Sequence, residues 1–267
     1  MSRKERADVL CVSQGLFDSR EKAKRAIMAG IVHTKSERID KPGMKIPADT
    51  ELFIKGEKLK YVSRGGLKLE KALQTFPIEM QDKVMMDIGS STGGFTDCAL
   101  QNGARKVIAV DVGTNQLVWS LRSDERVEVH EQTNFRHVTP DMFSEAPDVA
   151  TIDVSFISLA HIFAALKDII KPGGVVMALI KPQFEAGREQ VGKHGIVREA
   201  SVHEDVVNRV KAFAQDNGFG LLDLTYSPIT GGEGNIEFLG YFKQGAEPND
   251  VDVHAVVTEA HGHFEGK

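Results

Sequence analysis

From residue 83 onward, short apolar runs alternate with segments of helical or loop character. Runs of this length that are apolar throughout are typical of strands buried on both faces of a sheet. Residues 159–170 and 202–217 are the clearest helices between and after them. The alternation predicts an α/β fold, with a parallel, doubly wound sheet covered by helices on both faces. The predicted strands span residues 84–88, 106–112, 127–130, 148–154, 174–180, 221–226 and 235–242.

The first of these strands runs into the glycine turn Asp87-Ile-Gly-Ser-Ser-Thr-Gly-Gly-Phe95, and a helix is predicted directly after it. A strand, a glycine turn and a helix together bring backbone N–H groups and a helix N-terminus against a polar ligand. Asp111 ends the next apolar run, where a carboxylate can accept hydrogen bonds from two ribose hydroxyls. The turn and Asp111 therefore predict a site for an adenosine-containing cofactor.

The spacing of the glycines narrows the choice of cofactor. A dinucleotide-binding turn needs G-x-G-x-x-G, in which the second glycine admits the pyrophosphate. Here the pattern is G-x-x-x-G-G, and Ser91 stands two residues after Gly89. S-adenosylmethionine has no phosphate, so the sequence favours it over the dinucleotide of a nicotinamide dehydrogenase. A purely steric role for these glycines is the alternative.

Charge is distributed unevenly along the chain, although the net charge of the 267 residues is only −5. Residues 1–71 contain 17 Lys and Arg against 10 Asp and Glu, whereas residues 72–267 contain 16 against 28. This asymmetry predicts a basic module that binds nucleic acid, joined to an acidic body. A chance imbalance on a solvated surface is the alternative.

The composition also excludes several classes of protein. Cys11 and Cys98 are the only cysteines, and there is no C-x-x-C motif, which predicts no metal site and a reducing, cytoplasmic location. No apolar stretch approaches the roughly 20 residues of a membrane span, so no membrane partner is expected. Nothing in the sequence predicts the oligomeric state.

Residues 6–54 predict a small unit made of a helix, a turn, a basic helix and short strands. The basic helix covers residues 20–29 and ends at Gly30, a common residue after a helix C-terminus. Exposed cations here and near the second part of the chain are expected to contact nucleic-acid phosphates. The predicted contacts are Arg3, Arg20, Lys22, Lys24, Arg25 and Arg64, with Arg188 in a later loop.

Four ionisable side chains are expected where the predicted strands end. Asp153 and Lys181 each end an apolar run, and Glu237 interrupts an otherwise apolar strand. Lys68 lies on the helix predicted over residues 66–74. Because a buried ionised lysine is unfavourable unless it is paired, these residues form either structural ion pairs or, taken together, a catalytic group.

These segments resemble the TlyA family of rRNA 2′-O-methyltransferases, whose members are also named hemolysins. The first part resembles the small αL-motif RNA-binding domain through Gly15-Leu16, Ser19-Arg20, Ala23-Lys24 and Gly30. The second part resembles FtsJ-like methyltransferases through residues 61–69, 87–96, 153–158 and 181–188. Tyr61 and Leu59 depart from the residues common in the family's linker.

The resemblance implies a Rossmann-like methyltransferase sheet of seven mostly parallel strands, preceded by a small α+β RNA-binding domain. It implies an RNA-binding domain over residues 1–55, a linker over 56–63, a methyltransferase domain over 64–244 and an acidic C-terminal tail, or short helix, over 245–267. It makes Lys68, Asp153, Lys181 and Glu237 the catalytic residues. The implied cofactor site is Asp87, Gly89, Ser90, Gly93, Gly94, Phe95, Asp111 and Asn134.

The implied activity is transfer of a methyl group from S-adenosylmethionine to a ribose 2′-hydroxyl of ribosomal RNA, with cytidines of the ribosomal subunits as targets. Lys181 is expected to act as the base or as a steering cation. The loop Gly187–Gly195 is expected either to close over the nucleotide or to be an ordinary connection. The alternatives are an RNA-binding, ribosome-associated factor with weak or lost methyltransferase activity, and a membrane-active hemolysin.

Overall fold

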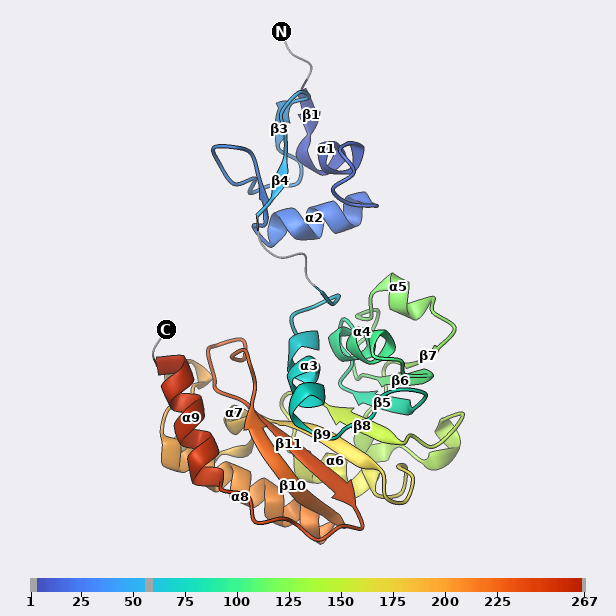
Figure 1. The fold of residues 1–267 in the computed structure, drawn as a ribbon, viewed down its shortest axis with the longest axis vertical. Helices are drawn as coiled ribbons and strands as arrows, with labels where there is room; N and C mark the ends of the chain where they lie inside the picture. Colours follow the sequence, from blue (N-terminus) through green and yellow to red (C-terminus); the bar gives the residue numbers. More distant parts are fainter. Residues whose placement is uncertain (1–3, 56–59, 266–267) are drawn as a thin grey trace. The chain divides into compact units, whose positions relative to one another are not determined.

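The computed structural model describes residues 4–55 and 60–265, and the chain forms two compact units (Figure 1). The first unit is Met1–Lys60 and the second is Tyr61–Lys267. Arg3 and Leu59, which the sequence analysis singled out, lie outside the described residues.

The first unit is built from two helices and two small antiparallel sheets. Strand β1 pairs with β3, and β2 pairs with β4. A small apolar core that includes Leu10, Ala23 and Ile27 joins the helices. The elements are β1 (Lys4–Arg6), α1 (Ala7–Ser13), α2 (Arg20–Met28), β2 (Val32–His33), β3 (Lys45–Pro47) and β4 (Phe53–Ile54).

A buried carboxylate holds part of the positive charge of this unit in place. Asp8 is fully buried, and its two oxygens accept from Arg6 Nε and Arg20 Nη2, each at 2.9 Å. The hydrogen bond from Arg6 does most to hold the pKa of Asp8 at about 2, with Arg20 adding to it. Arg20 therefore has a structural partner that fixes the start of α2 against α1.

The second unit contains a seven-stranded sheet in the order β10-β11-β9-β8-β5-β6-β7. The strands from β9 to β7 are parallel, and β11 runs antiparallel to both β9 and β10. This confirms the predicted Rossmann-like, mostly parallel sheet. The strands are β5 (Val84–Ile88), β6 (Lys106–Val110), β7 (Val127–His130), β8 (Val149–Ile152), β9 (Val175–Ile180), β10 (Phe219–Tyr226) and β11 (Phe238–Gln244).

Helices cover both faces of this sheet (Figure 1). One apolar core joins the sheet to α6, α8 and α9, and the other joins it to α3 and α4. The α-helices are α3 (Gly66–Thr75), α4 (Gly94–Gln101), α5 (Trp119–Arg122), α6 (Leu159–Leu166), α7 (Pro182–Glu185), α8 (Ala200–Asp216) and α9 (Val253–Glu265). The 3₁₀ turns are η1 (Phe135–His137), η2 (Pro140–Met142), η3 (Arg188–Gln190) and η4 (Lys193–Gly195). No helix within the described residues is both long and apolar enough to cross a membrane.

The structure decides between two alternatives for one segment and corrects the expectation for two residues. The tail after residue 244 contains α9, because Val253, Val257 and Ala260 share one helix face and are buried against the rest of the unit. Tyr61, expected in a linker, is buried, and its hydroxyl donates to Glu70 Oε1 at 3.0 Å. Glu237, expected inside a strand, lies in the loop that precedes β11.

A histidine pair joins α8 to α9. His203 is fully buried, with Nε2 at 3.2 Å from the carbonyl oxygen of Val197 and Nδ1 at 2.9 Å from His261 Nε2. A carbonyl oxygen can only accept, so Nε2 of His203 carries the proton and Nδ1 accepts from His261. Burial, with a smaller effect of His261, lowers the pKa of His203 to about 4.

This pair predicts that acid destabilises the fold. Between pH 6.5 and about 4 the unfolded chain protonates this histidine while the folded chain keeps His203 neutral. The free energy of unfolding therefore falls as the pH falls through this window, by roughly 3 kcal/mol in total. Urea unfolding at pH 7 and pH 4.5 measures this fall in the free energy of unfolding. The fall should be smaller in His203→Gln, which keeps a donor for Val197, than in the unchanged protein. An equal fall in the free energy of unfolding in the two proteins would contradict the assignment of this pH effect to His203.

Candidate active site

The topology of the sheet brings the four predicted ionisable residues to one edge. Asp153 follows β8 and Lys181 follows β9, two neighbouring parallel strands. Phe238, the first residue of β11, pairs with Ile180, so Glu237 lies beside Lys181 at the same edge. The carboxyl ends of parallel strands are the usual place for ligands in such sheets.

Lys68 reaches this edge from α3 and completes a connected set of ion pairs. Its Nζ lies 2.7 Å from Glu237 Oε2 and 3.9 Å from Asp153 Oδ2. Lys181 Nζ lies 2.6 Å from Asp153 Oδ1. Both lysine side chains are only 10 % exposed, and that of Glu237 is 2 % exposed. Two cations and two anions thus balance one another out of water, with Asp153 between the two lysines.

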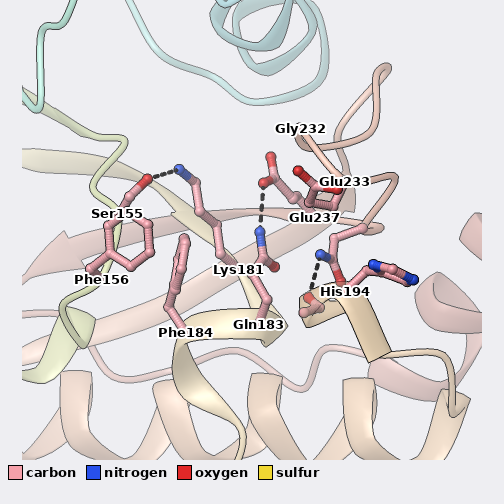
Figure 2. A pocket seen from close by; sticks show the side chains of 11 residues that line it. Ser155, Phe156, Lys181, Gln183, Phe184, His194, Gly232, Glu233 and Glu237 are labelled. Atoms are coloured by element: carbon pink, nitrogen blue, oxygen red, sulfur yellow. Dashed lines mark hydrogen bonds between the residues drawn. The ribbon is translucent and has the colours of Figure 1, made fainter. Parts of the chain in front are cut away.

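Neighbouring side chains fix the positions of these charged groups (Figure 2). Lys181 Nζ donates to Ser155 Oγ at 3.2 Å. Gln183 Nε2 donates to Glu237 Oε1 at 3.1 Å, so each oxygen of this buried carboxylate has a donor. Lys181 and Glu237 are therefore each held by more than their ion pairs.

Lys181 and Glu237 line a cavity of about 400 Å³. Phe156 and Phe184 stand on one side of it, with ring centroids 4.8 Å apart, and His194 lies on the other side (Figure 2). Phe156 is 91 % exposed and has a φ of 63°, a left-handed conformation that is unusual for a bulky residue. This "nucleophile cavity" combines an open aromatic surface with a lysine.

A second cavity of about 610 Å³ lies next to the nucleophile cavity, and we call it the "cofactor cavity". The two cavities share Ser155 and Phe156 in their walls, and Asp153 lines the second. The ion-pair network thus stands between two neighbouring cavities, an arrangement suited to a reaction between two ligands.

Three of the predicted cofactor residues line the cofactor cavity: Gly89, Asp111 and Asn134. Gly89 has a φ of +85°, and a Cβ there would collide with the backbone carbonyl of Asp153. Asp111 accepts backbone N–H groups from Ser91 at 2.8 Å and from Gly113 at 2.7 Å, one on each oxygen. Each carboxylate oxygen can accept a second hydrogen bond, so Asp111 can still bind a pair of hydroxyls.

The other five predicted cofactor residues stand behind this wall, because their side chains or close backbone contacts support the turn. Asp87 is fully buried and accepts from Thr96 Oγ1 at 2.7 Å. Burial raises the pKa of Asp87 to about 7 against the effect of that hydrogen bond. The remaining four, which are Ser90, Gly93, Gly94 and Phe95, are also buried and do not line the cavity.

Steric packing explains two of these glycines. A Cβ on Gly93 would collide with Leu121, and one on Gly94 would collide with Ser63 and come within 2.8 Å of the Gly66 backbone nitrogen. Gly94 therefore lets α4 pack closely against the start of α3, whereas Gly93, which has a φ of +103°, packs against Leu121 of α5. For these two glycines the structure supports the purely steric role that the sequence analysis gave as the alternative. Gly89, in contrast, lines the cofactor cavity.

The predicted RNA-contacting cations differ in their surroundings. Lys22 pairs with Asp18 and Lys24 with Glu21, each at 2.7 Å on the surface of α2. Exposed pairs of this kind are weak, so both lysines can change partner, unlike Arg20 on its buried carboxylate. Arg25, Arg64 and Arg188 are exposed.

Several residues of the site had no signal of their own in the sequence. Ser155, Phe156, Gln183 and Phe184 lie three or four residues after a strand end, and Asn235 lies in a glycine-rich loop. Four of them lie in the segments 153–158 and 181–188 that carry the family resemblance, and Asn235 was indicated only by its proximity to Glu237. Among the described residues, no group of three or more His, Cys, Asp and Glu side chains is placed to hold a metal ion.

Comparison with known proteins shows which family this chain is similar to. The FtsJ-like methyltransferase family matches residues 61–244. A relative from Bacillus subtilis (strain 168), provisionally named rRNA methyltransferase YqxC, is 59% identical and covers 97% of this chain and 95% of its own. The 16S/23S rRNA (cytidine-2'-O)-methyltransferase TlyA of Mycobacterium tuberculosis (strain ATCC 25618 / H37Rv) is 39% identical over 89% of each chain. A solved structure from Streptococcus thermophilus, provisionally described as a hemolysin, is 57% identical, has a TM-score of 0.79 and covers 100% of this chain and 98% of that one.

The buried pair of Lys68 and Glu237 predicts a measurable cost when it is broken. In Lys68→Met the carboxylate of Glu237 loses its cation, which should lower the free energy of unfolding by about 3–5 kcal/mol. The double variant Lys68→Met/Glu237→Gln removes both charges and should recover most of that loss. Urea unfolding of both variants and of Arg105→Met, which breaks an exposed pair, measures the difference. A loss in Lys68→Met no larger than in Arg105→Met would contradict the prediction.

Proposed function

Because the chain belongs to the FtsJ-like methyltransferases, we propose that it moves a methyl group from S-adenosylmethionine to a ribose 2′-hydroxyl of ribosomal RNA. The observation that carries the proposal is the ion-pair network of Lys68, Asp153, Lys181 and Glu237 between two adjacent cavities. A relative named as acting on cytidine of 16S and 23S rRNA supports cytidine in the ribosomal subunits as the target.

The cofactor cavity suits S-adenosylmethionine. Its volume of about 610 Å³ lies within the usual range for small-molecule sites. Asp111 and Asn134 would hold the ribose and the adenine side, and Gly89 contributes to the wall of the cavity. When bound, S-adenosylmethionine supplies an electrophilic methyl group on a sulfonium, which is already a good leaving group.

The nucleophile cavity suits a nucleotide that is turned out of its RNA. Single-stranded bases commonly stack on exposed aromatic rings. Phe156 offers such a ring, and the contact with Phe184 holds it at the mouth of the cavity. A base stacked there would bring its ribose toward Lys181, which lines the same cavity.

Lys181 is the group placed to act on the 2′-hydroxyl. Its Nζ is held by Asp153 and Ser155, so the enzyme positions it before the RNA arrives. As a neutral amine it would accept the hydroxyl proton, and as an ammonium it would stabilise the developing alkoxide. Lys68, held by Glu237, shares Asp153 and so competes with Lys181 for that carboxylate. Asp153 is the residue through which the two lysines influence each other.

We infer that the chain divides its work between the predicted domains. Residues 1–55 would bind RNA through exposed cations such as Arg25, and the unit that begins at Tyr61 would carry out the methyl transfer. Phosphate contacts of this kind carry affinity and depend on salt, while the nucleophile cavity selects the nucleotide. A ribosomal RNA substrate would place the reaction in the cytoplasm.

The test of this function is Lys181→Ala. We expect it to lower the rate of methyl transfer by at least about 100-fold, because the group acting on the hydroxyl is lost. Affinity for S-adenosylmethionine should stay within a few fold, since Asp111 and Asn134 are untouched. Methylation is measured with a radioactive methyl group on purified ribosomal subunits, and cofactor affinity by calorimetry.

Lys167→Ala serves as the control, because Lys167 is an exposed lysine at the end of α6. It should methylate RNA like the unchanged enzyme. Near-normal turnover by Lys181→Ala would refute the role of this lysine, and loss of cofactor binding would show that the substitution disturbed the neighbouring cavity instead.

A further inference from the structure

One wall of the nucleophile cavity is the loop Gly192–Val197, which contains η4. His194 and Gly195 from this loop line the cavity opposite Phe156 and Phe184 (Figure 2). His194 has a φ of 62° and a ψ of 20°, in the left-handed region that residues other than glycine seldom adopt. Such a conformation persists only where the surrounding structure holds it.

The side chain of Asn235 holds this loop at two points. Its Oδ1 accepts from the backbone N–H of Val197 at 3.0 Å, and its Nδ2 donates to the carbonyl oxygen of Gly195 at 2.9 Å. Asn235 is only 2 % exposed. The N–H of Val197 donates and the carbonyl of Gly195 accepts, and a side-chain amide in this orientation satisfies both.

His203 holds the same loop from the other side. Its Nε2–H donates to the carbonyl oxygen of Val197 at 3.2 Å, so both backbone polar groups of Val197 have side-chain partners. Asn235 lies two residues before Glu237, and His203 lies on α8. The loop is therefore tied to the segment that supplies Glu237 and to the helix beneath it.

We propose that Asn235 and His203 are positioning residues that hold the Gly192–Val197 wall in the shape that receives the target nucleotide. The proposal rests on the proposed function, because it assigns the nucleophile cavity to a nucleotide. Asn235 lines that cavity, yet each polar atom of its side chain is already bonded to the loop. Asn235 therefore acts through the loop residues His194 and Gly195. Within the described part of the chain, its side chain makes no hydrogen bond to the ion-pair network.

The identity of residue 235 follows from this arrangement. In Asn235→Ala, the buried N–H of Val197 loses its acceptor and the carbonyl of Gly195 loses its donor, so the strained loop relaxes and the wall is lost. In Asn235→Asp, the acceptor for Val197 remains but the donor to Gly195 is gone. The two variants thus separate the two hydrogen bonds.

Steady-state methylation of ribosomal subunits by the full chain tests the proposal. Asn235→Ala should raise KM for the RNA on the order of tenfold, as expected for two lost hydrogen bonds. Its kcat should change by less than about threefold, and its affinity for S-adenosylmethionine by less than about twofold. His203→Leu should act in the same direction, while His203→Gln, which keeps a donor, should restore KM.

Amide hydrogen exchange gives a readout that does not depend on activity. The Val197 N–H should lose its protection in Asn235→Ala and keep it in Asn235→Asp, because the aspartate still accepts this bond. Asn249→Ala is the matched control, since the Asn249 side chain donates to the Leu222 carbonyl on the exposed surface. It should change neither KM nor the exchange of Val197.

An unchanged KM for RNA in Asn235→Ala would overturn the proposal, whether or not kcat falls in that variant. Unchanged protection of Val197 in that variant would overturn it as well. Failure of the unchanged enzyme to methylate any RNA would instead refute the proposed function, and the exchange data would still decide whether Asn235 holds the loop.

Discussion

The site depends on the pairing of buried charges at one edge of the sheet. Asp153 lies 2.6 Å from Lys181 and 3.9 Å from Lys68, and Lys68 lies 2.7 Å from Glu237. None of these groups is stable alone at such low exposure, so each requires the others. This requirement fixes where β8, β9, α3 and the start of β11 must meet. It also places Lys181 in the wall of the nucleophile cavity, beside Asp153 in the wall of the cofactor cavity, which is what the proposed methyl transfer needs.

Much of this architecture could be predicted from the sequence because it depends on local pattern. Apolar runs revealed the parallel strands, and the predicted seven-stranded sheet is confirmed. Since parallel strands end at one edge, Asp153 and Lys181 could be placed together before any coordinates existed. Asp111 stood out for the same reason, as the carboxylate that ends the second strand.

The remaining features depend on contacts that no local pattern records. Lys68 and Glu237 are 169 residues apart, so only the family resemblance, and no local pattern, could group them before the fold showed their contact. The glycine pattern could not show that Gly93 and Gly94 serve helix packing while Gly89 faces the cofactor cavity. The acidic composition after residue 244 did not indicate that α9 has a buried apolar face. Phe156 lies in a loop after β8, and no sequence pattern indicated that it lines a cavity.

Relatives of this chain include proteins named as rRNA methyltransferases and a structure provisionally described as a hemolysin, so the deciding question is whether the chain methylates RNA. The most direct measurement is to incubate the enzyme and S-adenosylmethionine carrying a radioactive methyl group with each purified ribosomal subunit, and then to map the label. The account predicts label on the ribose 2′-oxygen of a cytidine. Label on a base, or none on the RNA of either subunit, would contradict it.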